Sequence, residues 1–218
     1  MKKIIIGNWK LNLDHLEAIQ LLQKLNYTIE EGKEEKIDIV VSPSHTSLRS
    51  IQTIIDTDKL NIQLSAQDVS QFSGGAYTGE VSSHQLNKLN VNYCIVGHSE
   101  RRIELNESDE VINQKVHNLV SEGITPIVCF GETLEQRNSN KYLEHITNQI
   151  NSAVKGLRKD KVENLVFAYE PIWAIGTGEV ASVVDAVEVL SVVKAVSYTH
   201  LRAHETVLEL VCRLLLEK

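Results

Sequence analysis

Proline and cysteine are scarce in this chain of 218 residues, and long apolar runs are missing from it. With 3 prolines and 11 glycines, the composition is neither collagen-like nor of low complexity. The 3 cysteines, Cys94, Cys129 and Cys212, are odd in number and widely spaced. They therefore predict no disulfide framework and no zinc motif, and a reducing cytoplasm is the expected compartment.

Membranes and nucleic acids are not expected as partners. The apolar run at residues 4–6 is too short for a signal peptide, and no segment has the roughly 20 apolar residues of a membrane-spanning helix. Positive charge is sparse as well, because the formal net charge is −7 and the longest basic cluster is Arg101-Arg102. The hydrophobic content of 42% is sufficient for the core of one domain.

Short apolar segments alternate with amphipathic segments along residues 1–196. No hairpin signal joins the apolar segments, so we expect a parallel sheet built of βα units. The predicted strands are residues 4–6, 37–41, 62–66, 93–96, 125–130 and 165–169. The predicted helices are residues 16–25, 44–55, 83–89, 108–120, 138–154 and 182–196.

A doubly wound sheet and a (β/α)8 barrel both fit this alternation. No G-x-G-x-x-G follows the first strand and no Walker loop occurs, which weakens the nucleotide-binding versions of the doubly wound sheet. Asn8, Lys10, His98 and Glu170 each come just after the carboxyl end of a predicted strand. The active site of a barrel lies at that face, so these positions favour an α/β fold of the (β/α)8 TIM-barrel class.

The segment AYEPIWAIGTG, residues 168–178, has the most distinctive pattern in the chain. Glu170 leaves a buried strand, and Pro171 directly after it prevents a helix. Trp173 is large and apolar for a loop, and the two glycines at the far end permit close backbone approach. The arrangement suits a base that works away from water, although an ordinary strand-to-helix connection with a solvated glutamate is the alternative.

The hexamer GNWKLN, residues 7–12, places Lys10 within two residues of the first predicted strand. One interpretation is a solvated lysine beside an asparagine that makes a turn. The other is a fixed positive charge and an amide donor, Asn8, that face an anionic ligand. A phosphorylated substrate would need such local positive charge, because the chain as a whole is acidic.

His98 lies between the fourth predicted strand and the sequence SERR. A single histidine is more often structural than catalytic. Here, however, a helical turn can begin at the histidine, so that backbone N–H groups would point toward the ring. Their positive end disfavours the imidazolium, and a neutral imidazole can donate a hydrogen bond to a carbonyl oxygen.

Three segments together, GNWK at 7–10, GHSERR at 97–102 and the segment 168–178, resemble the triosephosphate isomerase family in order and spacing. The resemblance covers residues 1 to about 195. It implies that Glu170 abstracts the proton next to the carbonyl of dihydroxyacetone phosphate or glyceraldehyde 3-phosphate. It also implies that His98 polarises the carbonyl and moves a proton between the two oxygens of the enediolate.

The same resemblance implies supporting roles for other residues. Lys10 and Asn8 would hold charge and orientation, Glu100 would support the site, and the N–H of Gly176 would contact the phosphate. No metal and no organic cofactor are expected, because the reaction is proton transfer between positioned groups.

The glycine-flanked loop Gly74-Gly75-Ala76-Tyr77-Thr78-Gly79-Glu80 is, by itself, only a flexible loop. It resembles the interdigitating loop through which this family dimerises, and Thr78 would then approach the region of Asn8 and Lys10 in a neighbouring subunit. A homodimer is therefore expected. Cys129 follows the family as well, but it is expected to be a small buried residue without a chemical role.

The end of the chain departs from the family pattern. A (β/α)8 chain typically has about 250 residues, and residues 1–196 account for about six βα units. The Tyr-Gly-Gly-Ser loop and the second Gly-Gly loop of the family, which bind phosphate, are not found. Residues 197–218 resemble translated library-adapter sequence, with a terminal helix over 207–216 as the alternative.

We accordingly expect an incomplete barrel over residues 1–196, followed by an artefactual tail at residues 197–218 that is unrelated to the family. Unpaired edges on the first and sixth strands would make the chain poorly stable and nearly inactive. Two other hypotheses stay open. The chain could be an inactive fragment that keeps only the dimerisation loop, or another α/β-barrel lyase or isomerase that acts next to a carbonyl. The combination of His98 and Glu170 argues against the latter.

Overall fold

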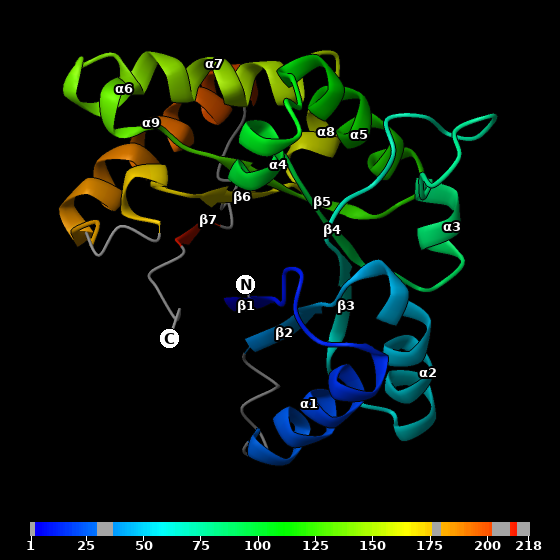
Figure 1. Ribbon diagram of the computed structural model, residues 1–218. Coiled ribbons are helices and arrows are strands. Elements are labelled where there is room, and N and C mark those ends of the chain that lie inside the picture. Colours follow the sequence, from blue (N-terminus) through cyan, green and yellow to red (C-terminus); the bar gives the residue numbers. More distant parts are fainter. Residues whose placement is uncertain (1–2, 30–36, 176–179, 202–209, 213–218) are drawn as a thin grey trace. The chain divides into compact units, whose positions relative to one another are not determined.

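A computed structural model describes residues 3–29, 37–175, 180–201 and 210–212, in which strands and helices alternate (Figure 1). The strands are β1 (Lys3–Asn8), β2 (Ile37–Ser42), β3 (Gln63–Ala66), β4 (Tyr93–Val96), β5 (Thr125–Phe130), β6 (Val166–Tyr169) and β7 (Leu210–Cys212). The α-helices are α1 (His15–Thr28), α2 (Leu48–Asp58), α3 (Ser83–Asn87), α4 (Ser99–Glu104), α5 (Asp109–Ser121), α6 (Leu134–Asn138), α7 (Tyr142–Val154), α8 (Lys159–Val162) and α9 (Val183–Leu201). Two 3-10 turns, η1 (His45–Ser47) and η2 (Ile172–Ala174), complete the described elements.

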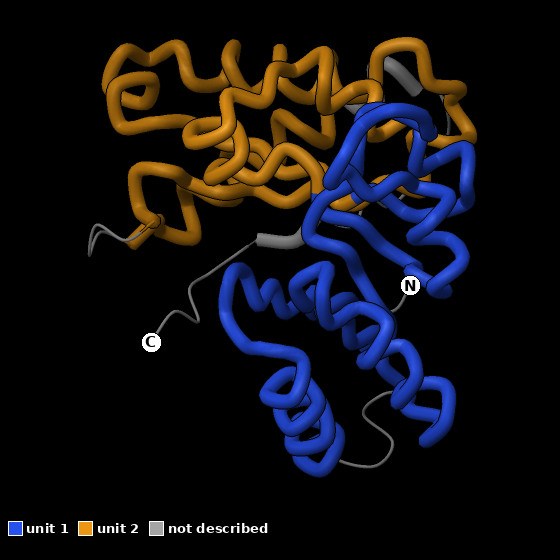
Figure 2. Tube along the Cα trace, turned by 45° about the vertical axis from the view of Figure 1, so that its right-hand side comes forward, with its two compact units in different colours: residues 1–95, 118–126 blue, residues 96–117, 127–218 orange. Residues whose placement is uncertain are grey.

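The chain divides into two compact units (Figure 2). Unit 1 is Met1–Ile95 with Asn118–Pro126, and unit 2 is Val96–His117 with Ile127–Lys218. In unit 1, β1 to β4 pair in chain order, and every printed pair is parallel. In unit 2, β5, β6 and β7 also pair in parallel. The predicted parallel sheet of βα units is confirmed.

Unit 1 is held together by short buried strands and one-sided helices. Val40 and Val41 of β2 are each 1% exposed, and β2 runs in register with β1 from Lys3↔Ile37 to Asn8↔Ser42. Helix α1 begins at Asp14, which accepts hydrogen bonds from two backbone N–H groups in a capping box. It buries Leu22 and packs beside α2 (Figure 1). The register of β1 on β2 fixes the position of Asn8 at the carboxyl end of its strand.

Unit 2 has a continuous apolar core around β6. Phe167 and Tyr169 of that strand are both 0% exposed. Helix α7 turns Ile146 and Ile150 inward, and it packs against α9, which buries Val193. Ile146 and Ile150 recur at helical spacing on one face of α7, as expected of a helix that packs its apolar face on the core. This packing supports the strand end that carries Glu170.

Two details of the predicted helices were wrong. The helix expected over residues 138–154 is α7, which begins only at Tyr142 because Asn140 has φ of 56° and an α-helix requires φ near −63°; the separate short helix α6 before it was not predicted. The short helices α4 and α8 were not predicted as separate elements. Both helices are too short for a hydrophobic period to be visible in the sequence.

The expected unpaired edge on the sixth strand was also wrong. β6 pairs in parallel with β7, from Phe167↔Leu210 to Tyr169↔Cys212, so backbone groups on that edge are bonded. The alternative of a helix over 207–216 is wrong for Leu210–Cys212, because these three residues form a strand. Helix α9 continues to Leu201. The division of the chain at residue 196 stays a prediction.

Among the described helices, none combines the length and the apolar composition of a membrane-spanning segment.

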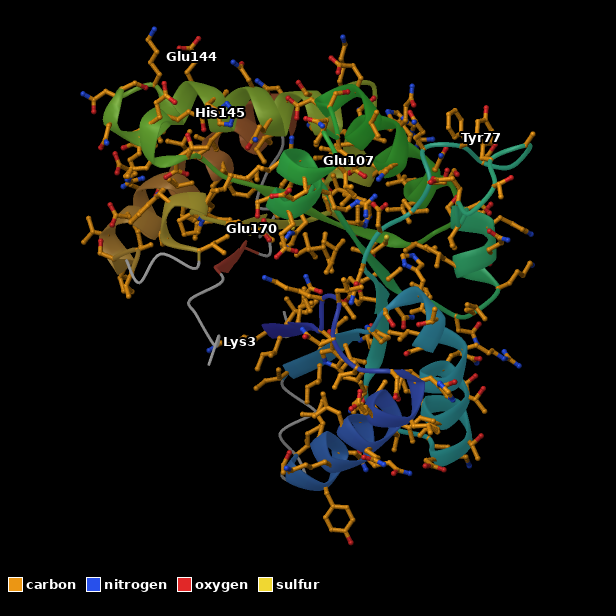
Figure 3. The ribbon with its side chains drawn as sticks, viewed as in Figure 1. Lys3, Tyr77, Glu107, Glu144, His145 and Glu170 are labelled. Carbon is orange, nitrogen blue, oxygen red and sulfur yellow. The ribbon has the colours of Figure 1, made fainter. Side chains whose placement is uncertain are left out.

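A buried group of charges joins α4 to α5. Arg101 donates to Glu107 Oε1 from Nε and Nη2, both at 2.7 Å, and Lys115 Nζ donates to the same oxygen at 2.5 Å. The side chains of Glu107 and Lys115 are 8% and 4% exposed (Glu107 is labelled in Figure 3). Burial tends to raise the pKa of Glu107, but the hydrogen bonds from Arg101 and Lys115 outweigh it, and the pKa is lowered.

Replacing Glu107 by glutamine is expected to lower the free energy of unfolding by about 3 kcal/mol, because the buried Lys115 and the partly exposed Arg101 lose their counter-charge. The depressed pKa of Glu107 stabilises the folded chain above the pKa of an unfolded glutamate, and this contribution is lost as the pH falls through the folded value. Urea unfolding between pH 6 and pH 3 should therefore show a shallower pH dependence for Glu107→Gln than for the wild type. Glu144→Gln, at an exposed position of α7, is the control and should match the wild type. Equal unfolding free energies for Glu107→Gln and Glu144→Gln would contradict the expectation.

Candidate active site

His98 and Glu170, predicted from two separate segments, lie together in unit 2. His98 follows β4 and Glu170 follows β6, and the distance from His98 Nε2 to Glu170 Oε1 is 3.0 Å. The other carboxylate oxygen, Oε2, accepts a hydrogen bond of 3.0 Å from the backbone N–H of Ser99. His98 is 5% exposed and Glu170 4% exposed (Glu170 is labelled in Figure 3). The connection between β4 and α4 therefore satisfies both oxygens of a buried carboxylate.

The hydrogen bond at Nδ1 of His98 indicates which ring nitrogen carries the proton. His98 caps the N-terminus of α4, and its Nδ1 accepts a hydrogen bond of 3.3 Å from the backbone N–H of Glu100. A ring nitrogen that accepts carries no proton, so the proton of this neutral imidazole is on Nε2. Nε2 then donates to Glu170. The Glu100 carboxylate lies 3.5 Å from the same Nδ1, and its side chain is 51% exposed.

This pair has the parts that proton abstraction next to a carbonyl requires. An ionised carboxylate can act as the base, and a neutral N–H can hydrogen-bond the oxygen on which negative charge develops. In the observed state each group bonds the other, so the carboxylate must leave Nε2 before it can reach a carbon atom.

The backbone of Glu170 is held by the end of β5. Its N–H donates to the carbonyl of Phe130 at 2.8 Å. A Cβ placed on Gly131 would lie 1.8 Å from the carbonyl oxygen of Glu170, which no side chain tolerates. Only glycine permits this approach, so Gly131 fixes where the strand end that carries Glu170 can lie.

Glu132 is a functional residue that the sequence analysis missed. It is 0% exposed, and its Oε1 accepts three hydrogen bonds of 2.9 Å, from Tyr169 Oη, Trp173 Nε1 and Arg137 Nη1. Tyr169 directly precedes Glu170, and Trp173 follows it by three residues. One buried carboxylate therefore holds the chain on both sides of the base. An acidic residue just after the fifth strand was the only signal in the sequence.

The charge on Glu132 is balanced by Arg137. Burial tends to lower the pKa of Arg137, but the hydrogen bond to Glu132 and the surrounding charges of Tyr169, Glu132 and Asp185 together outweigh it, and the pKa is raised. The guanidinium also lies 4.6 Å from the ring centre of Tyr142 and 5.3 Å from that of Trp173. Burial, and then the charge of Glu132, raise the pKa of Tyr169. At neutral pH Arg137 is therefore a guanidinium and Tyr169 an un-ionised phenol.

Asn8 and Lys10 belong to unit 1. Asn8 ends β1, and its Oδ1 accepts a hydrogen bond of 3.0 Å from the backbone N–H of Lys10. Gln67 Nε2 donates to the carbonyls of Lys10 and Ser42, at 2.8 and 2.9 Å. Lys10 has φ of 52°, which is uncommon for a residue other than glycine. The hydrogen bonds from Lys10 N–H to Asn8 and from Gln67 to the Lys10 carbonyl thus fix the backbone conformation of this turn.

The remaining predicted positions are Gly176, Cys129 and the loop of residues 74–80. Gly176 lies outside the described residues. Cys129 is 3% exposed, as expected of a small buried residue. In the loop of residues 74–80, the ring of Tyr77 stacks on that of Phe72 with centroids 3.6 Å apart. Tyr77 is nevertheless 43% exposed, and Figure 3 labels it on this loop.

Gly131→Ala should displace the backbone of Glu170, because the added methyl group has no room. We expect a fall in turnover of about 10²-fold, the size that a misplacement of 1 Å produces. Steady-state kinetics and circular dichroism melting measure the effect on activity and stability. Gly123→Ala is the control for backbone destabilisation. Its φ of 75° strains an alanine, but no atom lies within 4 Å of an added Cβ, so this variant should lower the melting temperature and keep the turnover of the folded protein. Turnover unchanged in Gly131→Ala would show that this contact does not fix Glu170.

Comparison with known proteins identifies the family. The family described as triosephosphate isomerase matches residues 3–212. The triosephosphate isomerase of Saccharopolyspora erythraea is 49% identical over 191 residues, which is 88% of this chain and 73% of the relative. Those of Corynebacterium efficiens and Corynebacterium glutamicum are 49% and 48% identical over 193 residues, 88% of this chain and 74% of each relative. The chain therefore belongs to the triosephosphate isomerase family, and the isomerase function and TIM-barrel class predicted from its sequence are confirmed.

Proposed function

We propose that Glu170 and His98 perform the isomerisation of dihydroxyacetone phosphate and glyceraldehyde 3-phosphate in this chain. The observation that carries the proposal is their 3.0 Å pairing at the carboxyl ends of β6 and β4. Both side chains are almost fully buried, so electrostatic interactions with a bound substrate are stronger there than in water.

In the proposed reaction, the Glu170 carboxylate takes a proton from the carbon beside the substrate carbonyl. The electron pair of that C–H bond forms the C=C bond of an enediolate, and the carbonyl oxygen becomes negative. His98 Nε2–H hydrogen-bonds this oxygen and passes a proton between the two enediolate oxygens. Glu170 then returns its proton to the neighbouring carbon. No electron acceptor and no cofactor take part in this sequence of steps.

The resting hydrogen bonds also support the proposal. Glu170 is bonded by Ser99 N–H and by His98 Nε2. When the carboxylate turns toward the substrate carbon, these two donors become available for the substrate oxygens. The base and the oxyanion donors are thus assembled before the substrate arrives, which is the electrostatic preorganisation that such catalysis requires.

Asn8, Lys10, Glu100 and Gly176 complete the proposed site. Lys10 would supply positive charge and Asn8 orientation, and the N–H of Gly176 would bind the phosphate. The family resemblance supports these roles, and so does the fixed turn at residues 8–10. For Glu100 the support is its backbone N–H, which sets the tautomer of His98.

Glu170→Gln and His98→Gln should each lower kcat by about 10²- to 10⁴-fold, the range that a positioned acid or base contributes. The coupled assay for both triose phosphates measures this, with exchange of the substrate proton for deuterium as a second readout. Glu104→Gln makes the same chemical change at an exposed position of α4 and should keep wild-type turnover. If Glu170→Gln retained full activity, the assignment of the base would be wrong. Wild-type protein without turnover would instead favour an inactive fragment.

We further propose a cytoplasmic homodimer that assembles through residues 74–80. The resemblance of this loop supports the dimer, as does the exposure of Tyr77, whose stacking on Phe72 gives the loop a rigid aromatic surface. For the compartment, the support is that the three cysteines are odd in number and widely spaced in the sequence.

Thr78→Arg should weaken the dimer, because it places a large charged group at the centre of the proposed contact. Sedimentation velocity over a concentration series should show wild-type dimers and a shift of the variant toward monomers. Thr57→Arg, at an exposed position of α2, adds the same charge elsewhere and should leave the sedimentation unchanged. A variant Thr78→Arg that sediments as the wild type does would exclude this loop as the interface.

A further inference from the structure

Arg102 of α4 makes contacts that neither the reaction nor the sequence motif explains. Its Nε donates to the carbonyl of Gly97 at 2.7 Å, and its Nη2 donates to the carbonyl of Cys129 at 3.3 Å. The third nitrogen, Nη1, pairs with Asp109 Oδ1 at 2.6 Å. The side chain is only 13% exposed. All three nitrogens of the guanidinium are therefore bonded, two of them to the main chain.

The two carbonyls lie on the segments that carry the catalytic pair. Gly97 directly precedes His98, so its carbonyl belongs to the peptide that leads into the histidine. Cys129 directly precedes Phe130, whose carbonyl accepts the N–H of Glu170. One planar group thus bonds the chain that positions the histidine and the chain that positions the base.

The packing around Gly97 leaves the guanidinium little freedom. Gly97 has φ of 69°, and a Cβ added to it would lie 3.0 Å from Arg102 Nη2 and 3.3 Å from the carbonyl oxygen of Cys129. Ile112 closes a third side, with its Cδ1 at 3.1 Å from the same point. The absence of a side chain on Gly97 is what admits the guanidinium between the two segments.

We propose that Arg102 is a positioning residue that sets the distance between His98 Nε2 and Glu170. This rests on the proposed roles of these two residues. A guanidinium suits the task because its fork of donors is rigid and can bond two acceptors at fixed angles. A lysine would keep the charge but would offer one flexible ammonium group, which cannot reproduce both bonds.

Arg102→Lys should lower kcat by about 10²-fold, the cost of a misplacement of about 1 Å, and should leave KM nearly unchanged because Arg102 touches no substrate. The nitrogen-15 spectrum of the imidazoles should show His98 protonated on Nε2 in the wild type and a mixture of tautomers in the variant. This spectrum is read on the resting protein, so it does not depend on turnover.

Arg101→Lys is the matched control. It makes the same change one residue away, where the guanidinium bonds Glu107 instead of the main chain. It should lower the melting temperature but leave the kcat of the folded protein and the His98 spectrum unchanged. Asp109→Asn removes the ion pair of Arg102 but not its two carbonyl bonds, and should reduce kcat less than Arg102→Lys does.

The outcomes separate this inference from the proposed function. If Arg102→Lys keeps the wild-type kcat and the His98 spectrum, or loses activity only in proportion to its folded fraction, the positioning role is overturned. If His98→Gln and Glu170→Gln abolish turnover in the same experiment, the proposed function still stands. Full turnover in His98→Gln and Glu170→Gln would overturn the catalytic assignment itself.

Discussion

The hydrogen bond between His98 Nε2 and Glu170 Oε1 is the interaction on which the site depends. A buried carboxylate is tolerated only when donors replace the water that it has lost. Glu170 obtains them from the histidine ring and from the N–H of Ser99, both at the start of α4. Helix α4 must therefore begin at His98, and the ends of β4 and β6 must lie within reach of each other.

Successive contacts hold this geometry in place. Gly131 lets the end of β5 approach the carbonyl of Glu170, and Glu132 bonds the residues on both sides of it. On the other side, Gly97 admits Arg102 between the segments that lead to His98 and to Phe130. The two glycines act through the absence of a side chain. The polar groups act through hydrogen bonds that would be costly to leave unmade inside the protein.

The sequence predicted the parts of the site that depend on local order. His98 and Glu170 follow apolar strands directly, so periodicity alone places them at strand ends. Periodicity could not predict the hydrogen bonds of Glu132, because its partners Tyr169 and Trp173 are 37 and 41 residues away from it along the chain. The interruption of the helix at Asn140 and the pairing of β6 with β7 were not predicted, for related reasons. A left-handed residue and a three-residue strand leave no periodic signal.

The resting bonds of Glu170 also explain how a buried base can be both stable and reactive. An N–H donor left without a partner inside a protein costs about 1–3 kcal/mol, so a site with permanently empty oxyanion donors would be unstable. Here the donors on His98 and Ser99 bond the carboxylate while no substrate is bound. In the proposed reaction, a substrate oxygen would take the place of the carboxylate on these donors as the carboxylate turns to the carbon. The donors would stay bonded throughout, and the negative charge would move from one acceptor to another within the same set of N–H groups.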